Sequence, residues 1–67
     1  MNIGAFNTYD EAKEILSAYI DGARKHPGLR GIEYRIYPYY GKYAIYRGRT
    51  YSDFPNNGEY IFAARAN

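Results

Sequence analysis

Tyrosines and basic residues concentrate in one short stretch of this 67-residue chain. Residues 31–51 hold seven of its ten tyrosines, and residues 30–51 hold five lysines or arginines against one acid, Glu33. Tyrosine offers a large contact area and a hydroxyl, and both tyrosine and arginine are enriched at the hot spots of protein interfaces. The same pair binds single-stranded nucleic acid, where bases stack on rings and cations contact phosphates. The chemistry expected of this stretch is therefore non-covalent recognition.

A β-hairpin would bring these side chains onto one surface. A turn at Tyr40-Gly41, with Gly41 supplying the positive φ of a tight turn, pairs Tyr39 with Lys42. Because side chains alternate along a strand, three isoleucines then share the opposite, buried face (Ile32, Ile36 and Ile45). The residues expected to be exposed and to bind a partner are Arg35, Tyr37, Tyr39, Tyr40, Lys42 and Tyr46, with Arg49 and Tyr51 at the rim.

Two residues leave the hairpin register open. Pro38 cannot donate a hydrogen bond to the ladder, so its strand is an edge there or the turn is wider than two residues. Arg47 falls on the apolar face, and a bulge near Gly48 would change the alternation. A slip of one residue would exchange the two faces.

The segment from Thr8 to Lys25 predicts a helix. Thr8 is a good N-cap, and Glu11 three residues later completes a capping box. Gly22 costs the helix about 1 kcal/mol relative to alanine, and Pro27 follows the helix as a stop signal. The apolar positions recur at helical spacing on one side: Ala12, Ile15, Leu16, Tyr19, Ile20 and Ala23.

Two further strands are expected. Asn2–Phe6 fits a short first strand. Residues 52–58 are loop-like in composition, and Asn57-Gly58 is a turn signal. Residues 59–65 then form a final strand with apolar residues on both sides, which predicts a central strand or one covered on both faces.

Together these elements predict one α+β domain, residues 1–67, with the order β-α-β-β-β. One helix packs on one face of a small, mostly antiparallel sheet. The opposite face has no helix to cover it, and we expect the tyrosines and cations to lie exposed there.

The composition argues against several other functions. With no cysteine and one histidine, His26, a disulfide or a transition-metal site is not expected. No nucleophile triad, phosphate loop or carboxylate pair is evident, so we expect no catalytic residues, no cofactor and no enzyme activity. No apolar run approaches the roughly 20 residues of a membrane span and no signal peptide is apparent, so a cytoplasmic location is expected.

The leading hypothesis is a non-enzymatic protein-binding module that docks its hairpin face on an acidic protein surface. Its size class is that of small stand-alone inhibitors or modulators of phages and mobile elements, anti-CRISPR proteins among them. Single-stranded nucleic-acid binding through the same residues is the alternative, favoured by the cations but not by the small net charge of +2. Two other readings stay open: cross-strand tyrosines that only stabilise the sheet, and a homodimer through this face.

The N-terminal segment Ile3-Gly4-Ala5-Phe6-Asn7, followed by Asp10-Glu11-Ala12, resembles the start of SPOR domains. Those domains begin with V-G-A-F-S and an E-A-containing helix, and they bind denuded peptidoglycan glycans. The resemblance implies glycan binding as a remote alternative. SPOR domains have a second helix after the third strand, where we expect a loop in this chain.

Overall fold

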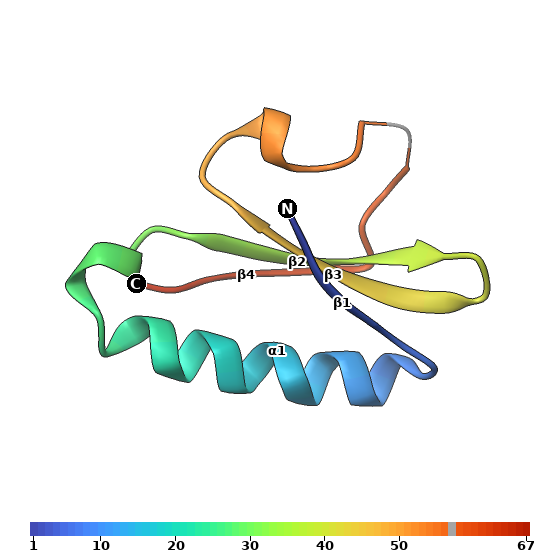
Figure 1. Ribbon diagram of the computed structural model, residues 1–67, viewed down its shortest axis with the longest axis horizontal. Coiled ribbons are helices and arrows are strands. Elements are labelled where there is room, and N and C mark those ends of the chain that lie inside the picture. Colours follow the sequence, from blue (N-terminus) through green and yellow to red (C-terminus); the bar gives the residue numbers. More distant parts are fainter. Residues whose placement is uncertain (57) are drawn as a thin grey trace.

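A computed structural model shows one helix packed beneath a four-stranded antiparallel sheet (Figure 1). The structure describes residues 1–56 and 58–67. Its sheet has the order β1-β3-β2-β4, so β2 and β3 are central. The predicted α+β fold with the order β-α-β-β-β is therefore confirmed. The elements are β1 (Asn2–Phe6), α1 (Tyr9–Arg24), β2 (Glu33–Tyr39), β3 (Lys42–Gly48) and β4 (Phe62–Arg65), with 3₁₀ turns at Pro27–Leu29 and Tyr51–Asp53.

Helix α1 forms where the sequence predicts it and supplies four of the nine residues of the main core. The Thr8 hydroxyl accepts a hydrogen bond from the Glu11 backbone amide at 3.2 Å, which caps the first turn. Four of the six stripe residues are buried, whereas Ile15 and Tyr19 lie at the margin, 38% and 40% exposed. The core between helix and sheet comprises Ala12, Leu16, Ile20, Ala23, Ile32, Tyr34, Ile36, Ile45 and Ala66.

The hairpin of β2 and β3 has the predicted register. Tyr39 pairs with Lys42, and the pairing continues without a shift to Glu33 and Gly48. At the turn, Tyr40 has a φ of 48° and Gly41 a φ of 76°. Positive φ at both central residues is the mark of a type I′ turn, whose twist matches that of the flanking strands.

The structure decides both open points of the hairpin register. Strand β4 pairs with β2 only as far as Ile36, so β2 is an edge strand at Pro38. In the residues that the structure describes, no neighbouring strand on that side therefore requires the backbone N–H that proline lacks. The bulge considered near Gly48 is wrong, because Arg47 pairs regularly with Tyr34. The irregularity lies instead in β1, between Asn2 and Gly4.

Strand β4 differs from its prediction in both length and position. It begins at Phe62 rather than at residue 59, and it lies at the edge of the sheet rather than in its centre. Tyr60 precedes the strand and turns to the face opposite the helix, where its ring lies near Tyr37. Apolar residues on both sides of this segment therefore reflect a loop contact and not a central strand. The predicted Asn57-Gly58 turn includes Asn57, which lies outside the described residues.

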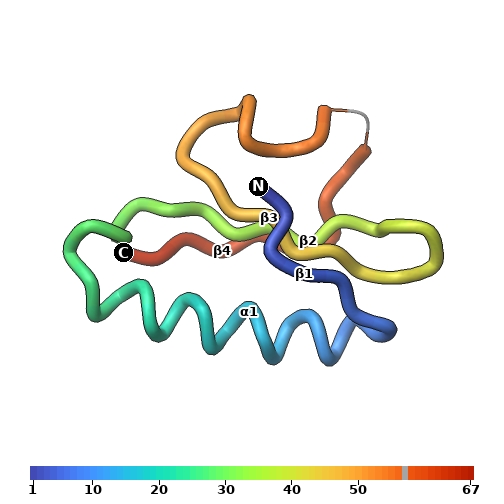
Figure 2. The backbone as a smooth tube through the Cα atoms, in the orientation of Figure 1, coloured from blue at the N-terminus to red at the C-terminus, as the bar shows by residue number. Residues whose placement is uncertain are grey.

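The sheet face opposite the helix is partly covered, against expectation. Residues 49–56, which follow β3, rise from the sheet and fold back over it, opposite α1 (Figures 1 and 2). Phe54 of this segment is 6% exposed, and beneath it Tyr37 is 4% and Ala44 0% exposed. A loop without a helix thus buries a second, smaller group of side chains, because its aromatic residues reach the sheet.

Candidate functional site

The covering loop divides the predicted binding residues into a buried group and an exposed group. Tyr37 is 4% exposed, and the Arg35 side chain is 14% exposed. The expectation that these two residues face solvent is therefore wrong. Lys42 and Arg49 are exposed and Tyr46 is half-buried. The most exposed tyrosines of the predicted set are Tyr40 at 92%, Tyr51 at 87% and Tyr39 at 43%.

Arg35 is held inside a cluster of aromatic rings. Its guanidinium lies 4.2 Å from the centre of the Phe54 ring and 4.6 Å from that of Tyr60. The same group donates hydrogen bonds to the Glu33 carboxylate and, at 3.1 Å, to the Tyr37 hydroxyl. Burial opposes its charge, but these two partners raise the pKa of Arg35 overall. Arg35 therefore fastens the loop to the sheet.

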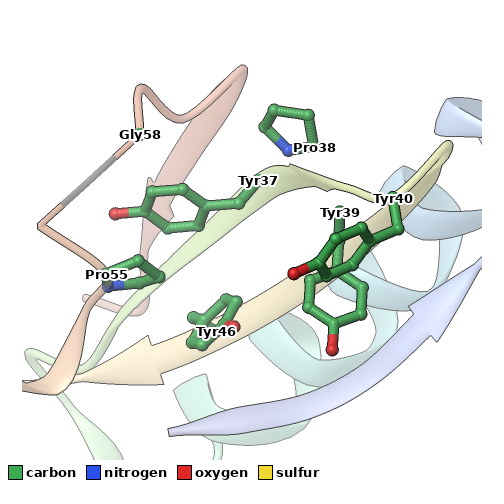
Figure 3. Close-up of a pocket in the computed structure, with 7 residues that line it drawn as sticks. All are labelled: Tyr37, Pro38, Tyr39, Tyr40, Tyr46, Pro55 and Gly58. Carbon is green, nitrogen blue, oxygen red and sulfur yellow. The ribbon is translucent and has the colours of Figure 1, made fainter.

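Four tyrosines and two prolines line an open hollow beside this cluster, which we call the tyrosine basin (Figure 3). Its volume is about 410 Å³. The Tyr39 and Tyr40 rings lie at the hairpin end, 4.8 Å apart and nearly perpendicular, while Pro55 lies at the loop end (Figure 3). The lining residues are Tyr37, Pro38, Tyr39, Tyr40, Tyr46, Pro55 and Gly58.

Tyr40 occupies a backbone conformation that a tyrosine adopts at a cost. Among the described residues it is the one non-glycine residue with positive φ. Left-handed conformations cost L-residues about 1–2 kcal/mol, and asparagine or glycine is preferred at this turn position. The ring gains little burial in return, since 92% of the residue is exposed and its aromatic contact is with the neighbouring Tyr39. Strain of this kind is typical of functional sites.

The cations of the hairpin have different surroundings. The Arg49 guanidinium donates to the carbonyls of Gly28, at 2.5 Å, and Arg30, at 3.1 Å, so it joins the end of β3 to the turn after α1. Arg35 is bound to Glu33. Lys42 is the cation beside the tyrosine basin, because it pairs directly with Tyr39.

Two carboxylates are held ionised by donors around them. Burial would raise the pKa of Glu33, but hydrogen bonds from Arg35 and Arg65 outweigh burial and lower the pKa below its ordinary value. The backbone amides of Arg49 and Thr50 donate to Asp53 at 2.9 and 3.1 Å and lower its pKa. Asp53 organises the start of the loop after β3, whereas Glu33 links β2 to β4 through Arg65.

In the described parts of the chain, no group of three or more histidine, cysteine or acidic residues could hold a metal ion. Among the same residues, no helix is long and apolar enough to cross a membrane.

No family model, curated protein or solved structure matches the chain. The resemblance to SPOR domains therefore remains the one seen in the N-terminal residues. Where those domains have a second helix, this chain has the short 3₁₀ turn Tyr51–Asp53 and an irregular segment.

Sequence reasoning missed the loop residues that complete the basin and the cluster, Phe54, Pro55 and Tyr60. Their signal was present, because residues 51–60 carry three aromatic side chains in a segment of loop composition. Rings of this size are seldom left in solvent by a chain with so small a core.

Proposed function

We propose that the protein is a non-enzymatic binding module of the small inhibitor or modulator kind. In this proposal it docks the tyrosine basin on an acidic protein surface. The observation that carries the proposal is Tyr40, which is strained in its backbone and 92% exposed beside a ring-lined hollow. An exposed aromatic side chain on a rigid turn contributes contact area at little entropic cost on binding.

The basin has the composition of an interface centre. Interface cores are enriched in tyrosine and depleted of most charged residues, while the rim is polar. Tyr39 and Tyr40 would be the anchors, with Tyr46 and the two prolines among the other residues that line the hollow. Lys42 stands beside Tyr39 and would meet a carboxylate of the partner. An interfacial pair of this kind mainly fixes orientation and the rate of association.

The test is affinity capture from a lysate of the organism that encodes the chain, with Tyr40→Asn compared side by side. Asparagine adopts the same φ, so the turn is kept and only the ring is lost. We expect the parent chain to recover a partner protein whether or not the lysate is treated with nuclease. Tyr40→Asn should weaken this binding by at least about thirtyfold, which corresponds to the roughly 2 kcal/mol that marks a hot spot.

Tyr19→Ala is the matched control, because Tyr19 is 40% exposed and Tyr39 43%, but Tyr19 lies on the helix at the other side of the molecule. Retention with Tyr19→Ala and loss with both Tyr39→Ala and Tyr40→Asn supports the proposal. A captured protein that binds all four chains equally well refutes the basin as the docking site.

Single-stranded nucleic acid is the second candidate, since the Tyr39 and Tyr40 rings are also suited to stacking on bases. Its affinity would fall linearly with salt on a logarithmic plot, with a slope set by the phosphates contacted. Recovery that nuclease abolishes, with such a slope, favours this candidate over the protein partner. If instead the sedimentation coefficient of the purified chain rises with its concentration, the molecule that occupies the tyrosine basin is a second copy of the chain.

A further inference from the structure

A second, smaller pocket opens on the loop-covered face, and we call it the arginine pocket. It has a volume of about 150 Å³. Three guanidinium groups and one carboxylate line it, which leaves two positive charges (3 − 1 = 2). Its lining residues are Glu33, Arg35, Arg49, Thr50, Tyr51, Phe54 and Arg65, and none of them lines the tyrosine basin.

Two of the three guanidinium groups are held in place before any ligand arrives: Arg49 by its hydrogen bonds to the carbonyls of Gly28 and Arg30, and Arg35 by the cluster around it. Phe54 and Tyr60 lie against Arg35 at 4.2 and 4.6 Å, and Glu33 and Tyr37 accept hydrogen bonds from its Nε and Nη1. Within the described part of the chain, its Nη2 donates to no protein atom. A donor already held in place costs little conformational entropy on binding.

Arg65 reaches the same carboxylate from strand β4. Its Nη2 donates to Glu33 Oε1 at 2.8 Å, while Arg35 contacts the other oxygen, Oε2. One carboxylate therefore serves two guanidinium groups and neutralises only one of them. The Arg65 side chain is 57% exposed, so it can turn toward a ligand without unfolding the sheet.

We propose that the arginine pocket binds a phosphoryl group in its dianionic, monoester form. Arginine matches phosphate oxygens with paired N–H donors, and clusters of arginine recognise phosphorylated side chains. A phosphate monoester carries a charge of about −1.5 to −2 at neutral pH, close to the surplus in the pocket. A carboxylate would leave one guanidinium without a counter-charge, and a phosphodiester of nucleic acid carries only one charge.

The pocket has room for this group. Water occupies about 30 Å³ per molecule in the liquid, so 150 Å³ corresponds to several waters, which a tetrahedral oxyanion would displace. Thr50 forms part of the wall, with its hydroxyl bonded to Ser52 and Asp53, and Tyr51 offers a ring for the remainder of the ligand. The arginine pocket shares no lining residue with the tyrosine basin, so phosphate binding is tested independently of the proposed protein binding.

The experiment is a titration of the full chain with sodium phosphate, then with O-phosphotyrosine and with dimethyl phosphate, near pH 7.5 at constant ionic strength. Amide chemical shifts report the site. We expect saturable shifts at Arg49 and Thr50 with phosphate and O-phosphotyrosine, with a dissociation constant of about 1–10 mM for so small a ligand. Sodium chloride at matched ionic strength should produce none.

The deciding variants are Arg65→Gln, Arg24→Gln and Glu33→Gln. Arg24 is a matched control, because its side chain is 55% exposed against 57% for Arg65 and it also pairs with a carboxylate, Asp21. Arg65→Gln should weaken phosphate binding about fivefold or more, and Arg24→Gln should leave it unchanged. Glu33→Gln should strengthen binding, since it removes the competing anion from the pocket.

Three results would overturn the proposal: no saturable shift beyond that of chloride, equal weakening by Arg65→Gln and Arg24→Gln, or dimethyl phosphate binding as tightly as phosphate. The last result would indicate a site for singly charged phosphodiesters. If Glu33→Gln does not fold, the comparison between the two arginine variants still decides, because both positions are solvent-accessible and leave the core intact.

Discussion

Tyr40 shows how one residue can oppose the local preference of its own turn. A type I′ turn favours asparagine or glycine at this position, and tyrosine accepts the positive φ with strain. The turn tolerates this strain because Gly41, the next residue, adopts the second positive φ without a steric penalty, and because the two flanking strands are fully paired. The exposed ring is then presented on a rigid turn rather than on a flexible loop.

Replacing Tyr40 by asparagine should stabilise the protein while removing the ring. We expect Tyr40→Asn to raise the free energy of unfolding by about 0.5–1 kcal/mol, because asparagine tolerates the left-handed conformation. Urea denaturation of the two proteins measures the difference. A destabilised Tyr40→Asn protein would mean that the ring contributes packing that outweighs the backbone strain.

Gly48 at the end of β3 is required for a different reason, the close approach of the loop. A Cβ atom placed there would collide with Asp53, whose Oδ2 and Cγ would lie 2.7 and 2.8 Å away. That carboxylate also accepts hydrogen bonds from the amides of Arg49 and Thr50, so it cannot move aside without losing them.

Gly48→Ala should therefore destabilise the protein by about 1–3 kcal/mol, as overpacking does elsewhere. Gly22→Ala is the matched control, because a Cβ at Gly22 meets nothing within 4 Å. Gly22 is exposed in the last turn of the helix, so its replacement should stabilise by about 0.5–1 kcal/mol. Thermal denaturation should show a lower melting temperature for Gly48→Ala and a higher one for Gly22→Ala. Equal changes in the two variants would contradict the close contact between Gly48 and Asp53.

At the scale of elements, the loop after β3 performs the task that a second helix performs in other α+β folds. Phe54 is buried on the sheet and stacks on Arg35 at 4.2 Å, and the loop hides Tyr37 beneath it. Few side chains hold the loop, so we expect it to detach more readily than the helix.

Phe54→Ala should cost about 3 kcal/mol or more, a large part of the stability of so small a domain. Because the helix–sheet core does not include Phe54, hydrogen exchange should rise first in the loop and at Tyr37. Tyr51→Ala is the control, since Tyr51 is 87% exposed and its loss should change stability by less than about 0.5 kcal/mol. Uniform exchange throughout the sheet would show that the loop and the core unfold together.

On the scale of the whole molecule, the two faces of the sheet are stabilised by different chemistry. The helix side is apolar, whereas the loop side depends on ionised groups, chiefly Glu33 between Arg35 and Arg65. Loop-side stability should therefore depend on pH, while helix-side packing should not.

Acid should weaken the protein through Glu33 and Asp53. Both pKa values lie below their ordinary values of 4.5 and 3.8, so the folded chain binds fewer protons than the unfolded chain in this range. The stabilisation is complete above about pH 4.5 and is lost as the pH falls through the lowered values. Melting temperatures measured from pH 7 to pH 2 should fall below pH 4.5, and Glu33→Gln should reduce the slope. If the melting temperature of Glu33→Gln falls with pH as steeply as that of the parent protein, Glu33 does not contribute to the acid sensitivity.

The sequence by itself determined the elements whose signals are local. The cap at Thr8 and the helical spacing from Ala12 to Ala23 determined the helix, because capping and periodicity act between near neighbours. The Tyr40-Gly41 turn predicted the hairpin register that the structure shows, although Pro38 and Arg47 left that register open until the strand pairing was known. These signals were also enough to place Tyr39, Tyr40 and Lys42 together at one end of the hairpin.

Only the tertiary structure decided which side chains of that face remain exposed. Nothing near Arg35 or Tyr37 in the sequence indicates that Phe54 and Tyr60, about twenty residues away, would cover them. Contacts between distant segments depend on how the loop closes, and loop closure is set by packing rather than by local pattern. The edge position of β4 could not be predicted for the same reason. An apolar segment has the same sequence pattern whether it forms an edge strand or a central strand.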